Sequence, residues 1–346
     1  MRGAVLSPER ERSWGRPGQE PGLWGIVLAG GEGVRLQPFL EALTGRVARK
    51  QFCPIGGRPL IRETFARAEL LIPRERLVTV VGAGMEAEAS PHLFDRPRET
   101  VVWQPRNRET GPGLLLPCCA VAAAEPDASV AVLPADHYVH EAGTFMERVR
   151  DAKRAVDAHP DLLVLLGVEA ESPETGYGWI AAGDAAEEAG PGHLRRVEQF
   201  REKPDPRTAA TFLAAGFLWN TLVLVARVRT LLGLFAAYLP EVTRRFAPVR
   251  AAWGTAGGPS AIRAAYADMS TVSVSRGILE HNPPNLRVLP VRGVLWSDWG
   301  SAARICQTLQ RVGHLHLLTE RFRRQGVDPA GALAAWCEGV CRAEAA

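Results

Sequence analysis

One stretch near the beginning of the chain constrains the fold more than any other. The residues from Trp24 to Ala29 are a short apolar run, and glycine follows at positions 30, 31 and 33. A short apolar run of β-forming residues bounded by glycine predicts a buried strand. Glycine directly after a strand lets the backbone approach a ligand closely and turn successive N–H groups toward an anion. We therefore expect a buried strand followed by an anion-binding loop, with an ordinary glycine-rich β-turn as the alternative.

Arg35 follows these glycines and supplies a fixed positive charge in a geometry that fits phosphate oxygens. The stretch is not a Walker loop, because no Gly-Lys-Ser or Gly-Lys-Thr follows it. It also lacks the G-x-G-x-x-G fingerprint of dinucleotide sites, which is accompanied by an acid after the second strand. The second predicted strand, Leu77 to Val81, runs into Gly-Ala-Gly instead. These features argue against a nicotinamide-dependent enzyme.

Length and composition are those of a globular chain. The 346 residues, 46% of them hydrophobic, are enough for one large α/β domain with an appendage, or for two domains. A formal net charge of +3 gives no support to a nucleic-acid partner. No apolar run is long enough for a membrane-spanning helix. Residues 1–22 contain Arg and Glu but no apolar stretch, which predicts a disordered leader rather than a signal peptide.

The spacing of the cysteines predicts no metal site. No two of them form a C-x-x-C pair, so we expect six reduced thiols in a cytoplasmic protein, with a metal or disulfide role as the alternative. They are Cys53, Cys118, Cys119, Cys306, Cys337 and Cys341.

Lysine is scarce, and its positions are therefore informative. Only three of the 41 basic residues are lysine, namely Lys50, Lys153 and Lys203. Where arginine is otherwise preferred, a lysine marks a position that needs a compact ammonium group. Lys153 lies on a predicted amphipathic helix and is expected at the surface. Lys50 and Lys203 lie in turns, and for Lys50 the alternative is a solvated loop lysine.

Predicted strands and helices alternate along the first half of the chain. Strands are predicted at 77–81, 100–103, 129–133 and 162–168, and helices at 60–71, 85–93, 114–124 and 145–158. This alternation predicts a parallel, doubly wound sheet. The second half predicts strands at 193–201, 217–226 and 288–291, helices within 228–263 and at 302–309, and a helical tail. We accordingly divide the chain into the leader (1–22), a main domain (23–300) and a helical C-terminal appendage (301–346).

Two acids lie in loops next to predicted elements. Asp136 follows the strand 129–133, at the strand end where open α/β sheets bind ligands, and Asp298 precedes the helix 302–309. Carboxylates in such places suit Mg²⁺ carried on a nucleotide, with a helix N-cap or turn residue as the alternative for Asp136. His137 is expected to form local hydrogen bonds rather than to bind a metal.

Other polar groups complete a set suited to phosphate chemistry. The loop 104–113 opens a helix and can offer donors to a base or a phosphate. Glu202 and Lys203 end a predicted strand, where they would bind a sugar hydroxyl and a phosphate or form an exposed ion pair. With the glycine loop and the two acids, these groups suit transfer at a nucleoside triphosphate. The residues alone thus indicate an α/β nucleotide enzyme and leave its substrates open.

The motifs become specific when they are taken in order along the chain. They are Leu28 to Pro38, Lys50-Gln51-Phe52, Leu133 to His137, Pro173 to Gly178, Glu202-Lys203-Pro204, Leu218-Trp219-Asn220 and Trp296 to Ser301. In this order they resemble the motifs of the sugar-1-phosphate nucleotidyltransferases, and among them most closely those of the bacterial mannose-1-phosphate guanylyltransferases. The resemblance implies a Rossmann-like, doubly wound, mixed and mostly parallel sheet with a small C-terminal helical appendage. It also implies that GTP and mannose 1-phosphate give GDP-mannose and pyrophosphate, by in-line attack on the α-phosphorus with Mg²⁺ as cofactor.

The resemblance further implies roles for individual residues. Arg35 and Lys50 would be catalytic and would hold the triphosphate. The nucleotide would contact Leu28, Ala29, Gly30, Gly31, Gly33, Gln104, Arg108, Thr110, Pro134 and Ala135. The sugar phosphate would contact Gly176, Glu202, Lys203, Asn220 and Glu280. Asp136 and Asp298 would hold Mg²⁺, which neutralises charge and orients the substrates.

Five positions depart from the family pattern. Val34 replaces a threonine, Arg49 a proline, Gln104 a glutamate, Glu109 an asparagine and Ser275 an aspartate. Glu109 adds a negative charge that opposes triphosphate binding, and Gln104 pairs less well than a carboxylate with the N1–H and N2–H₂ donors of guanine. Two alternatives follow: the same chemistry with another nucleoside triphosphate or sugar 1-phosphate, and a catalytically weak, sugar-nucleotide-binding regulatory protein.

The expected partners are small-molecule substrates only. Neither a nucleic acid nor a membrane is expected to bind the chain. The sequence leaves the oligomeric state open, with a homodimer as one alternative.

Overall fold

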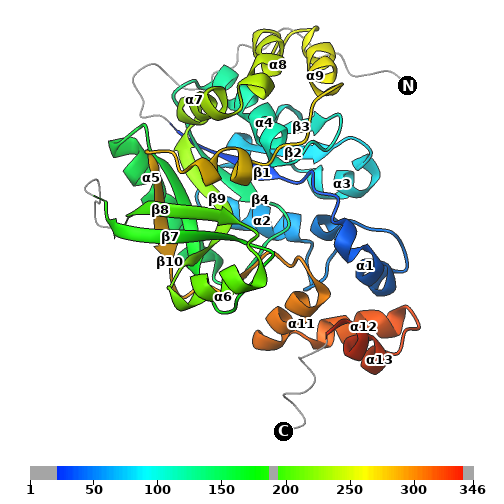
Figure 1. The fold of residues 1–346 in the computed structure, drawn as a ribbon. Coiled ribbons are helices and arrows are strands. Elements are labelled where there is room, and N and C mark those ends of the chain that lie inside the picture. Colours follow the sequence, from blue (N-terminus) through cyan, green and yellow to red (C-terminus); the bar gives the residue numbers. More distant parts are fainter. Residues whose placement is uncertain (1–21, 187–193, 338–346) are drawn as a thin grey trace.

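The computed structural model describes residues 22–186 and 194–337, which form a nine-stranded sheet with helices on both faces (Figure 1). The sheet contains β1 (Leu23–Leu28), β2 (Leu77–Gly82), β3 (Val101–Gln104), β4 (Ser129–Pro134), β6 (Leu163–Glu169), β7 (Gly178–Ala185), β8 (Arg195–Glu202), β9 (Leu218–Arg227) and β10 (Leu286–Val291). A separate two-stranded sheet contains β5 (Tyr138–Val139) and β11 (Trp296–Ser297). The expected leader, residues 1–22, lies outside the described residues except for Gly22.

The predicted helices are present, with ends that differ by a few residues. The helices of the structure are α1 (Gln37–Thr44), α2 (Leu60–Ala68), α3 (Glu86–Leu93), α4 (Thr110–Ala124), α5 (Ala142–Ala158), α6 (Pro206–Ala214), α7 (Val228–Tyr238), α8 (Pro240–Ala251), α9 (Gly258–Tyr266), α10 (Val274–Gly277), α11 (Ala302–Arg311), α12 (His316–Arg324) and α13 (Pro329–Trp336). Of these, α1 and α6 are helices that the sequence pattern did not predict. Among these described helices, none has the length and apolar character needed to cross a membrane.

The strand order of the large sheet is β3-β2-β1-β4-β9-β6-β10-β8-β7, and β7 also pairs with β9. β1 is parallel to both β2 and β4, and β6 is parallel to β10. β9 is antiparallel to its neighbours β4 and β6, and β8 is antiparallel to β10 and β7. Because only β8 and β9 run against the other strands, the predicted mixed and mostly parallel α/β sheet is confirmed.

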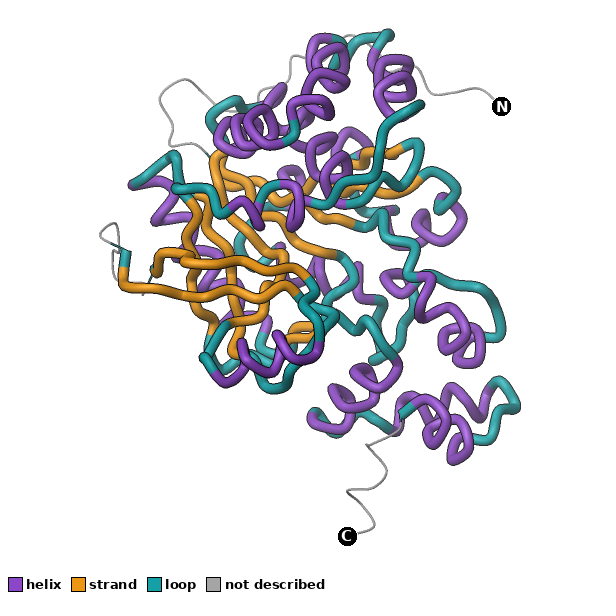
Figure 2. Tube along the Cα trace, viewed as in Figure 1, coloured by secondary structure: helices purple, strands orange, loops and turns teal. Residues whose placement is uncertain are grey.

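Helices cover both faces of the sheet, which explains why its central strands are apolar on both sides. On one face, α4 packs against β1 and β2 and α7 packs against β9, while α8 packs on α4 and α7 (Figure 2). On the other face lies α5, whose buried residues Phe145, Met146, Val149, Ala152 and Val156 recur at helical spacing. The central strands therefore contribute side chains to two apolar layers. Polar loops follow their ends.

The small sheet brings two distant loops together. β11 pairs with β5 in antiparallel fashion, with Trp296 opposite Val139 and Ser297 opposite Tyr138. Asp298 directly follows β11, and Asp136 lies two residues before β5. Continuing the same register places Asp298 beside His137. The pairing thus joins the two predicted acids, which are far apart in the sequence.

The three C-terminal helices share an apolar core with α1 (Figure 1). Phe39 and Leu40 of α1 pack in the same cluster as Ile305, Leu318 and Phe322. Phe39 and Phe322 meet edge to face, with ring centroids 6.1 Å apart. Through this cluster the C-terminal helices lie next to the glycine loop, because α1 follows that loop directly.

The expectation of six reduced cysteines is wrong for one pair. Cys306 of α11 and Cys337, which follows α13, form a disulfide, with Cα atoms 5.9 Å apart. The packing of α11 against α13 brings the two residues within the usual range for such a bond. Cys53, Cys118 and Cys119 are free and buried, and Cys341 lies outside the described residues.

Candidate active site

The glycine loop lies at the end of β1 and is shaped by a glutamine. The amide of Gln51 is buried and donates hydrogen bonds to the carbonyl oxygens of Ala29 (2.9 Å) and Gly31 (2.8 Å). Gly33 has φ of 61°, a left-handed conformation that glycine adopts without strain. A Cβ atom at Gly30 would lie 2.2 Å from the amide nitrogen of Gln104, so a larger residue there would displace that side chain. Contacts with neighbouring side chains therefore fix the conformation of this loop.

A cavity of about 210 Å³ opens beside this loop. Of the residues expected at the nucleotide and metal sites, it is lined by Leu28, Gly30, Gly31, Gln104, Thr110, Pro134 and Asp136. It is also lined by Gln51, Asn107, His137 and Leu222, which sequence reasoning did not assign to the site, and by Glu109. Gln51 and His137 stood within the recognised motifs, so a signal for them existed. Leu222 carried no such signal.

Gln104 presents an unused acceptor in this cavity. The residue is buried, and within the described part of the chain its Oε1 has no hydrogen-bond partner. A buried acceptor without a partner costs free energy, which a donor on a bound ligand would recover. The hydroxyl of Thr110, by contrast, already accepts a hydrogen bond from the Val274 N–H (2.9 Å).

Two residues that line the cavity have strained backbones. Glu109 has φ of 69° and ψ of −174°, a region that is almost restricted to glycine. Leu222 has φ of 56°, which is rare for a bulky side chain. Such strain concentrates at functional sites, where the surrounding structure holds it in place.

Lys50 connects the two predicted metal ligands. Its ammonium lies 2.9 Å from Oδ2 of Asp136 and also donates a hydrogen bond to the carbonyl oxygen of Asp298. The lysine is 5% exposed, so the alternative of a solvated loop lysine is wrong. It begins a short 3-10 helix, Lys50–Phe52, which sets its side chain against the loops after β4 and β11.

The environment keeps Asp136 charged. Burial alone would raise the pKa of its carboxyl, but the positive charge of Lys50 lowers that pKa below its ordinary value. Burial also lowers the pKa of His137, whose Nε2 lies 3.7 Å from Oδ1 of Asp136. The carboxylate is thus available to a cation, while the imidazole is neutral at pH 7.

Asp298 is held by a second cation. Nη1 of Arg304 lies 3.0 Å from Oδ1 of Asp298, and the same oxygen accepts a hydrogen bond from the Gly300 N–H (2.8 Å). Burial alone would lower the pKa of Arg304, but the charge of Asp298 raises it. The sequence offered no sign of this contact, because Arg304 lies in an ordinary helical pattern.

The residues expected at the sugar phosphate gather around Gly178. A Cβ atom there would lie 2.8 Å from Oε2 of Glu202 and 3.2 Å from Cβ of Asn220. Glu280 accepts a hydrogen bond from the Glu202 N–H (2.8 Å). Lys203 has a half-exposed side chain whose Nζ lies 3.3 Å from Glu202.

Gly176 lies elsewhere. A Cβ atom at this glycine would meet Nη2 of Arg304 at 3.1 Å. Gly178 is therefore the glycine of this motif that adjoins Glu202 and Asn220.

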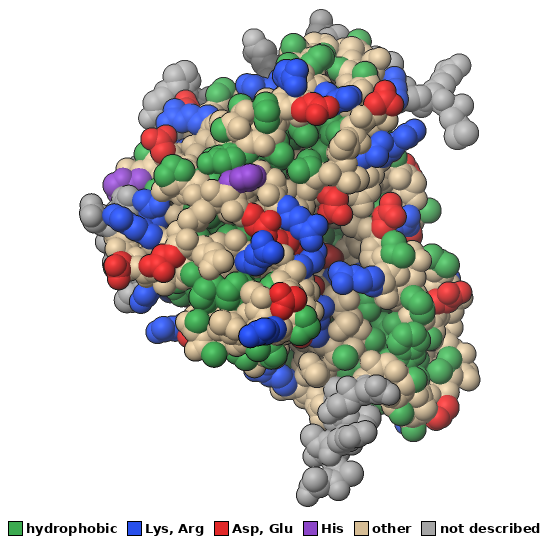
Figure 3. All heavy atoms as spheres, viewed as in Figure 1, with side chains coloured by type: hydrophobic (Ala, Val, Ile, Leu, Met, Phe, Trp, Pro, Cys, Tyr) green, Lys and Arg blue, Asp and Glu red, His purple; other side chains and the backbone are tan. Residues whose placement is uncertain are grey.

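The remaining predicted residues do not line the cavity. Ala29 and Ala135 are buried beneath the loops, and Gly33 turns the chain toward the 3-10 helix Val34–Leu36. Arg35 on that helix is exposed and makes no ion pair within the described residues. Arg108 donates to the Ala267 carbonyl (3.3 Å) instead of reaching the cavity. Figure 3 shows acidic and basic side chains mixed around the hollow of this face, rather than a continuous basic stripe.

Comparison with known protein families agrees with this geometry. A family model described as nucleotidyl transferase matches residues 24–238, which is more than half of the chain. The chain belongs to the nucleotidyl transferase family. The match contains the glycine loop, Lys50, Asp136, Glu202 and Asn220. Glu280 and Asp298 lie C-terminal to the matched residues, and the fold brings them to the site.

Named relatives place the chain more narrowly. The xanthan biosynthesis protein XanB of Xanthomonas campestris is 32% identical over 227 residues, which cover 64% of this chain and 44% of that protein. The mannose-1-phosphate guanylyltransferase ManC of Salmonella typhimurium is 29% identical over 231 residues, which cover 64% of this chain and 46% of that protein. The chain thus spans less than half the length of these two relatives.

A solved structure supports the fold. It is described as mannose-1-phosphate geranyltransferase from Thermus thermophilus and is 28% identical to this chain. The superposition has a TM-score of 0.71 and covers 83% of this chain and 79% of that chain. The predicted relationship to the mannose-1-phosphate guanylyltransferases is confirmed at the level of the family.

Proposed function

We propose that this nucleotidyl transferase joins GTP and mannose 1-phosphate to give GDP-mannose and pyrophosphate. The observation that carries the proposal is the position of Lys50, between the carboxylate of Asp136 and the backbone of Asp298. One ammonium and two acids thereby meet beside the cavity that adjoins the glycine loop. Transfer at a phosphate requires such groups, which position the phosphates and stabilise their negative charge. The names of the relatives supply the sugar and the base.

The proposed reaction is a single in-line displacement. A phosphate oxygen of mannose 1-phosphate attacks the α-phosphorus of GTP, and the bond from that phosphorus to the pyrophosphate breaks as the new bond forms. Lys50 and Arg35 stabilise negative charge on the triphosphate. Lys203 holds the sugar phosphate, and Glu202, Asn220 and Glu280 orient the sugar.

The residues present fit Mg²⁺ as cofactor. Asp136 and Asp298 offer hard carboxylate oxygens. This agrees with an ion that takes one or two carboxylates and completes its shell with water and substrate phosphates. When bound, Mg²⁺ would neutralise charge on those phosphates. Lys50 and Arg304 already contact the two acids. A bound metal would therefore share the carboxylates with these cations or displace the cations.

Base recognition is assigned to Gln104. Its unpartnered Oε1 can accept a hydrogen bond from N1–H or N2–H₂ of guanine. A uracil or thymine base can offer only its N3–H. The amino groups of adenine and cytosine can donate to the same oxygen, so Gln104 is compatible with guanine but lacks the pair of acceptors that a carboxylate would provide.

The test is pyrophosphate release with Mg²⁺, crossing four nucleoside triphosphates with mannose, glucose and N-acetylglucosamine 1-phosphates. We expect release with GTP and mannose 1-phosphate, and its loss in Asp136→Asn and Lys50→Ala. Lys153→Ala is the matched control, because Lys153 lies on α5 and its ion pair is with Asp157, away from the cavity. Release with another substrate pair would keep the chemistry and reject the proposed substrates.

A second candidate function is supported by two observations. Both acids are engaged by basic side chains, and Glu109 places a carboxylate in the nucleotide cavity. Both features disfavour a triphosphate with its metal, and they favour a catalytically weak protein that binds sugar nucleotides. Tight binding of GDP-mannose without pyrophosphate release from any substrate pair would select this function.

A further inference from the structure

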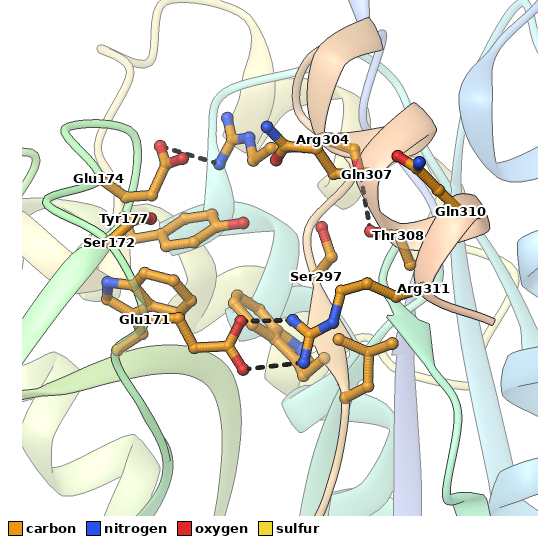
Figure 4. A pocket seen from close by; sticks show the side chains of 13 residues that line it. Glu171, Ser172, Glu174, Tyr177, Ser297, Arg304, Gln307, Thr308, Gln310 and Arg311 are labelled. Atoms are coloured by element: carbon orange, nitrogen blue, oxygen red, sulfur yellow. Dashed lines mark hydrogen bonds and ion pairs between the residues drawn. The ribbon is translucent and has the colours of Figure 1, made fainter. Parts of the chain in front are cut away.

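A second cavity, of about 290 Å³, lies between the loop before β7 and helix α11 (Figure 4). The loop contributes Glu171, Ser172, Glu174 and Tyr177, and α11 contributes Arg304, Gln307, Thr308, Gln310 and Arg311. The remaining lining residues are Trp219, Leu295, Trp296 and Ser297. None of these residues lines the cavity beside the glycine loop.

The second cavity opens on the other face of the sheet from the proposed sugar-phosphate residues. Successive side chains of a strand point to opposite faces. Asn220 adjoins Gly178 and Glu202, so its neighbour Trp219 points away from them. Tyr177, Trp219 and Trp296 accordingly belong to the apolar cluster that contains α5, and their rings contact one another edge to face. The two sites are thus separated by the sheet itself.

The charges around the second cavity compensate one another. Arg311 makes a two-pronged contact with Glu171, and Nη1 of Arg304 lies 3.7 Å from Glu174 in addition to its contact with Asp298. A phosphate or nucleotide would have to break these pairs. A cation would meet the same obstacle. The cavity therefore suits an uncharged ligand.

The uncharged polar groups of the cavity have hydrogen-bonding capacity to spare. Gln307 is exposed, Gln310 and Ser172 are half-buried, and in the described part of the chain their side chains make no hydrogen bond to protein. The buried indole N–H groups of Trp219 and Trp296 also have no partner there. Amides and hydroxyls that both donate and accept match ligand hydroxyls, which do the same. The aromatic rings add a flat apolar surface.

We propose that this cavity is a second ligand site, which binds a neutral monosaccharide. Its volume is at the lower end of ligand pockets, which span roughly 300–1,000 Å³. One sugar ring fits this space. The sugar hydroxyls form hydrogen bonds with the side-chain amides of Gln307 and Gln310, and the sugar ring packs against the aromatic side chains. The site is independent of the proposed function, because it needs neither nucleotide nor metal.

The test is ligand-detected NMR on the full chain without nucleotide or Mg²⁺, using mannose, glucose, N-acetylglucosamine and fucose as probes. The double variant Gln307→Ala/Gln310→Ala removes two amides of the cavity. Asn220→Ala alters the opposite face of the sheet. Gln199→Ala is the matched control, an exposed glutamine on β8 outside both cavities. Circular dichroism checks that each variant is folded.

We expect at least one hexose to bind wild type, Asn220→Ala and Gln199→Ala, and to bind the double variant about 10-fold more weakly. The reverse pattern, with binding lost in Asn220→Ala and kept in the double variant, would place the sugar at the proposed substrate site and overturn the inference. Absence of binding to wild type at about 10 mM sugar would also overturn it. Pyrophosphate release is measured separately, so failure of the proposed function is distinguishable.

Discussion

The guanidinium of Arg304 lies 3.0 Å from the carboxylate of Asp298, and two glycines lie beside this contact. A Cβ atom at Gly300 would lie 2.8 Å from Nη2 of Arg304, and one at Gly176 would lie 3.1 Å from it. The guanidinium also covers the ring of Tyr177 at 4.6 Å. Both partners are largely shielded from water. Asp298 is therefore a carboxylate whose charge is already compensated before any metal binds.

Arg304→Gln should make the stability of the protein depend on Mg²⁺. Removing one partner of a shielded ion pair leaves the other charge uncompensated, at a cost of about 2–4 kcal/mol. A metal that binds Asp298 would restore part of this loss. We expect a lower Tm without Mg²⁺ and a larger rise on adding Mg²⁺ than in wild type, measured by thermal unfolding.

The control for this variant is Arg311→Gln, which breaks an exposed pair with Glu171 and should change the Tm little. An equal loss of Tm with and without Mg²⁺ would show that Asp298 does not bind the metal.

Substitutions of Glu109 should separate charge from strain at the nucleotide cavity. Glu109→Gln removes the charge and keeps a side chain at φ of 69°. Glu109→Gly removes both, and relief of the strain is worth about 1–3 kcal/mol. We expect both variants to lower the KM for GTP, and only Glu109→Gly to raise the free energy of unfolding, measured by urea titration. A KM that is unchanged in both would mean that the carboxylate does not face the triphosphate.

At position 222, glycine should give a protein at least as stable as alanine does, which reverses the usual order. The φ of 56° at Leu222 disfavours any residue with a Cβ atom, by about 1–2 kcal/mol. Glycine carries an entropic cost of roughly 0.5–1 kcal/mol. We therefore expect Leu222→Gly to be at least as stable as Leu222→Ala, although it removes more atoms. Urea unfolding of the two variants measures the difference, and greater stability of Leu222→Ala would refute the strain.

Asp95→Asn should change the response of the protein to acid. Arg62 binds both carboxylate oxygens of Asp95, at 2.7 and 3.0 Å, and Arg96 adds further contacts. The hydrogen bonds from Arg62 hold the pKa of Asp95 well below its ordinary value. Because the folded pKa is lower than the unfolded pKa, this stability is complete above about pH 4 and is lost as the pH falls.

Urea unfolding at pH 7 and pH 3 measures this effect. We expect the difference in free energy of unfolding between wild type and Asp95→Asn to shrink at pH 3. Asp161→Asn, at an exposed acid without an ion pair in the described structure, should show no such trend. An Asp95→Asn difference that is the same at both pH values would contradict the assignment.

Much of the fold could be predicted because its signals are local. The apolar run of β1, the glycines after it and the amphipathic pattern of α5 each follow from neighbouring residues. Asp136 could be predicted at the site because it directly follows β4, and loops at the ends of parallel strands meet at one edge of a sheet. The scarcity of lysine correctly singled out Lys50 as more than a surface residue.

Other features depend on contacts between distant segments. Asp298 reaches Lys50 because β11 pairs with β5, and Arg304 of α11 contacts Asp298 beside Gly176 and Gly300. The disulfide between Cys306 and Cys337 requires α11 and α13 to pack together.

The sequence by itself thus determined the alternation of strands and helices, because the short periods of these elements can be read along the chain. It also contained the glycine loop and the family motifs, which are runs of neighbouring residues. The tertiary structure alone decided three things: that Gly178 rather than Gly176 adjoins Glu202, that Asp298 carries its own cation, and that a second cavity lies behind the sheet. The reason is physical. Local backbone preferences act over a few residues, whereas side-chain pairing and cavity shape depend on how separate elements pack.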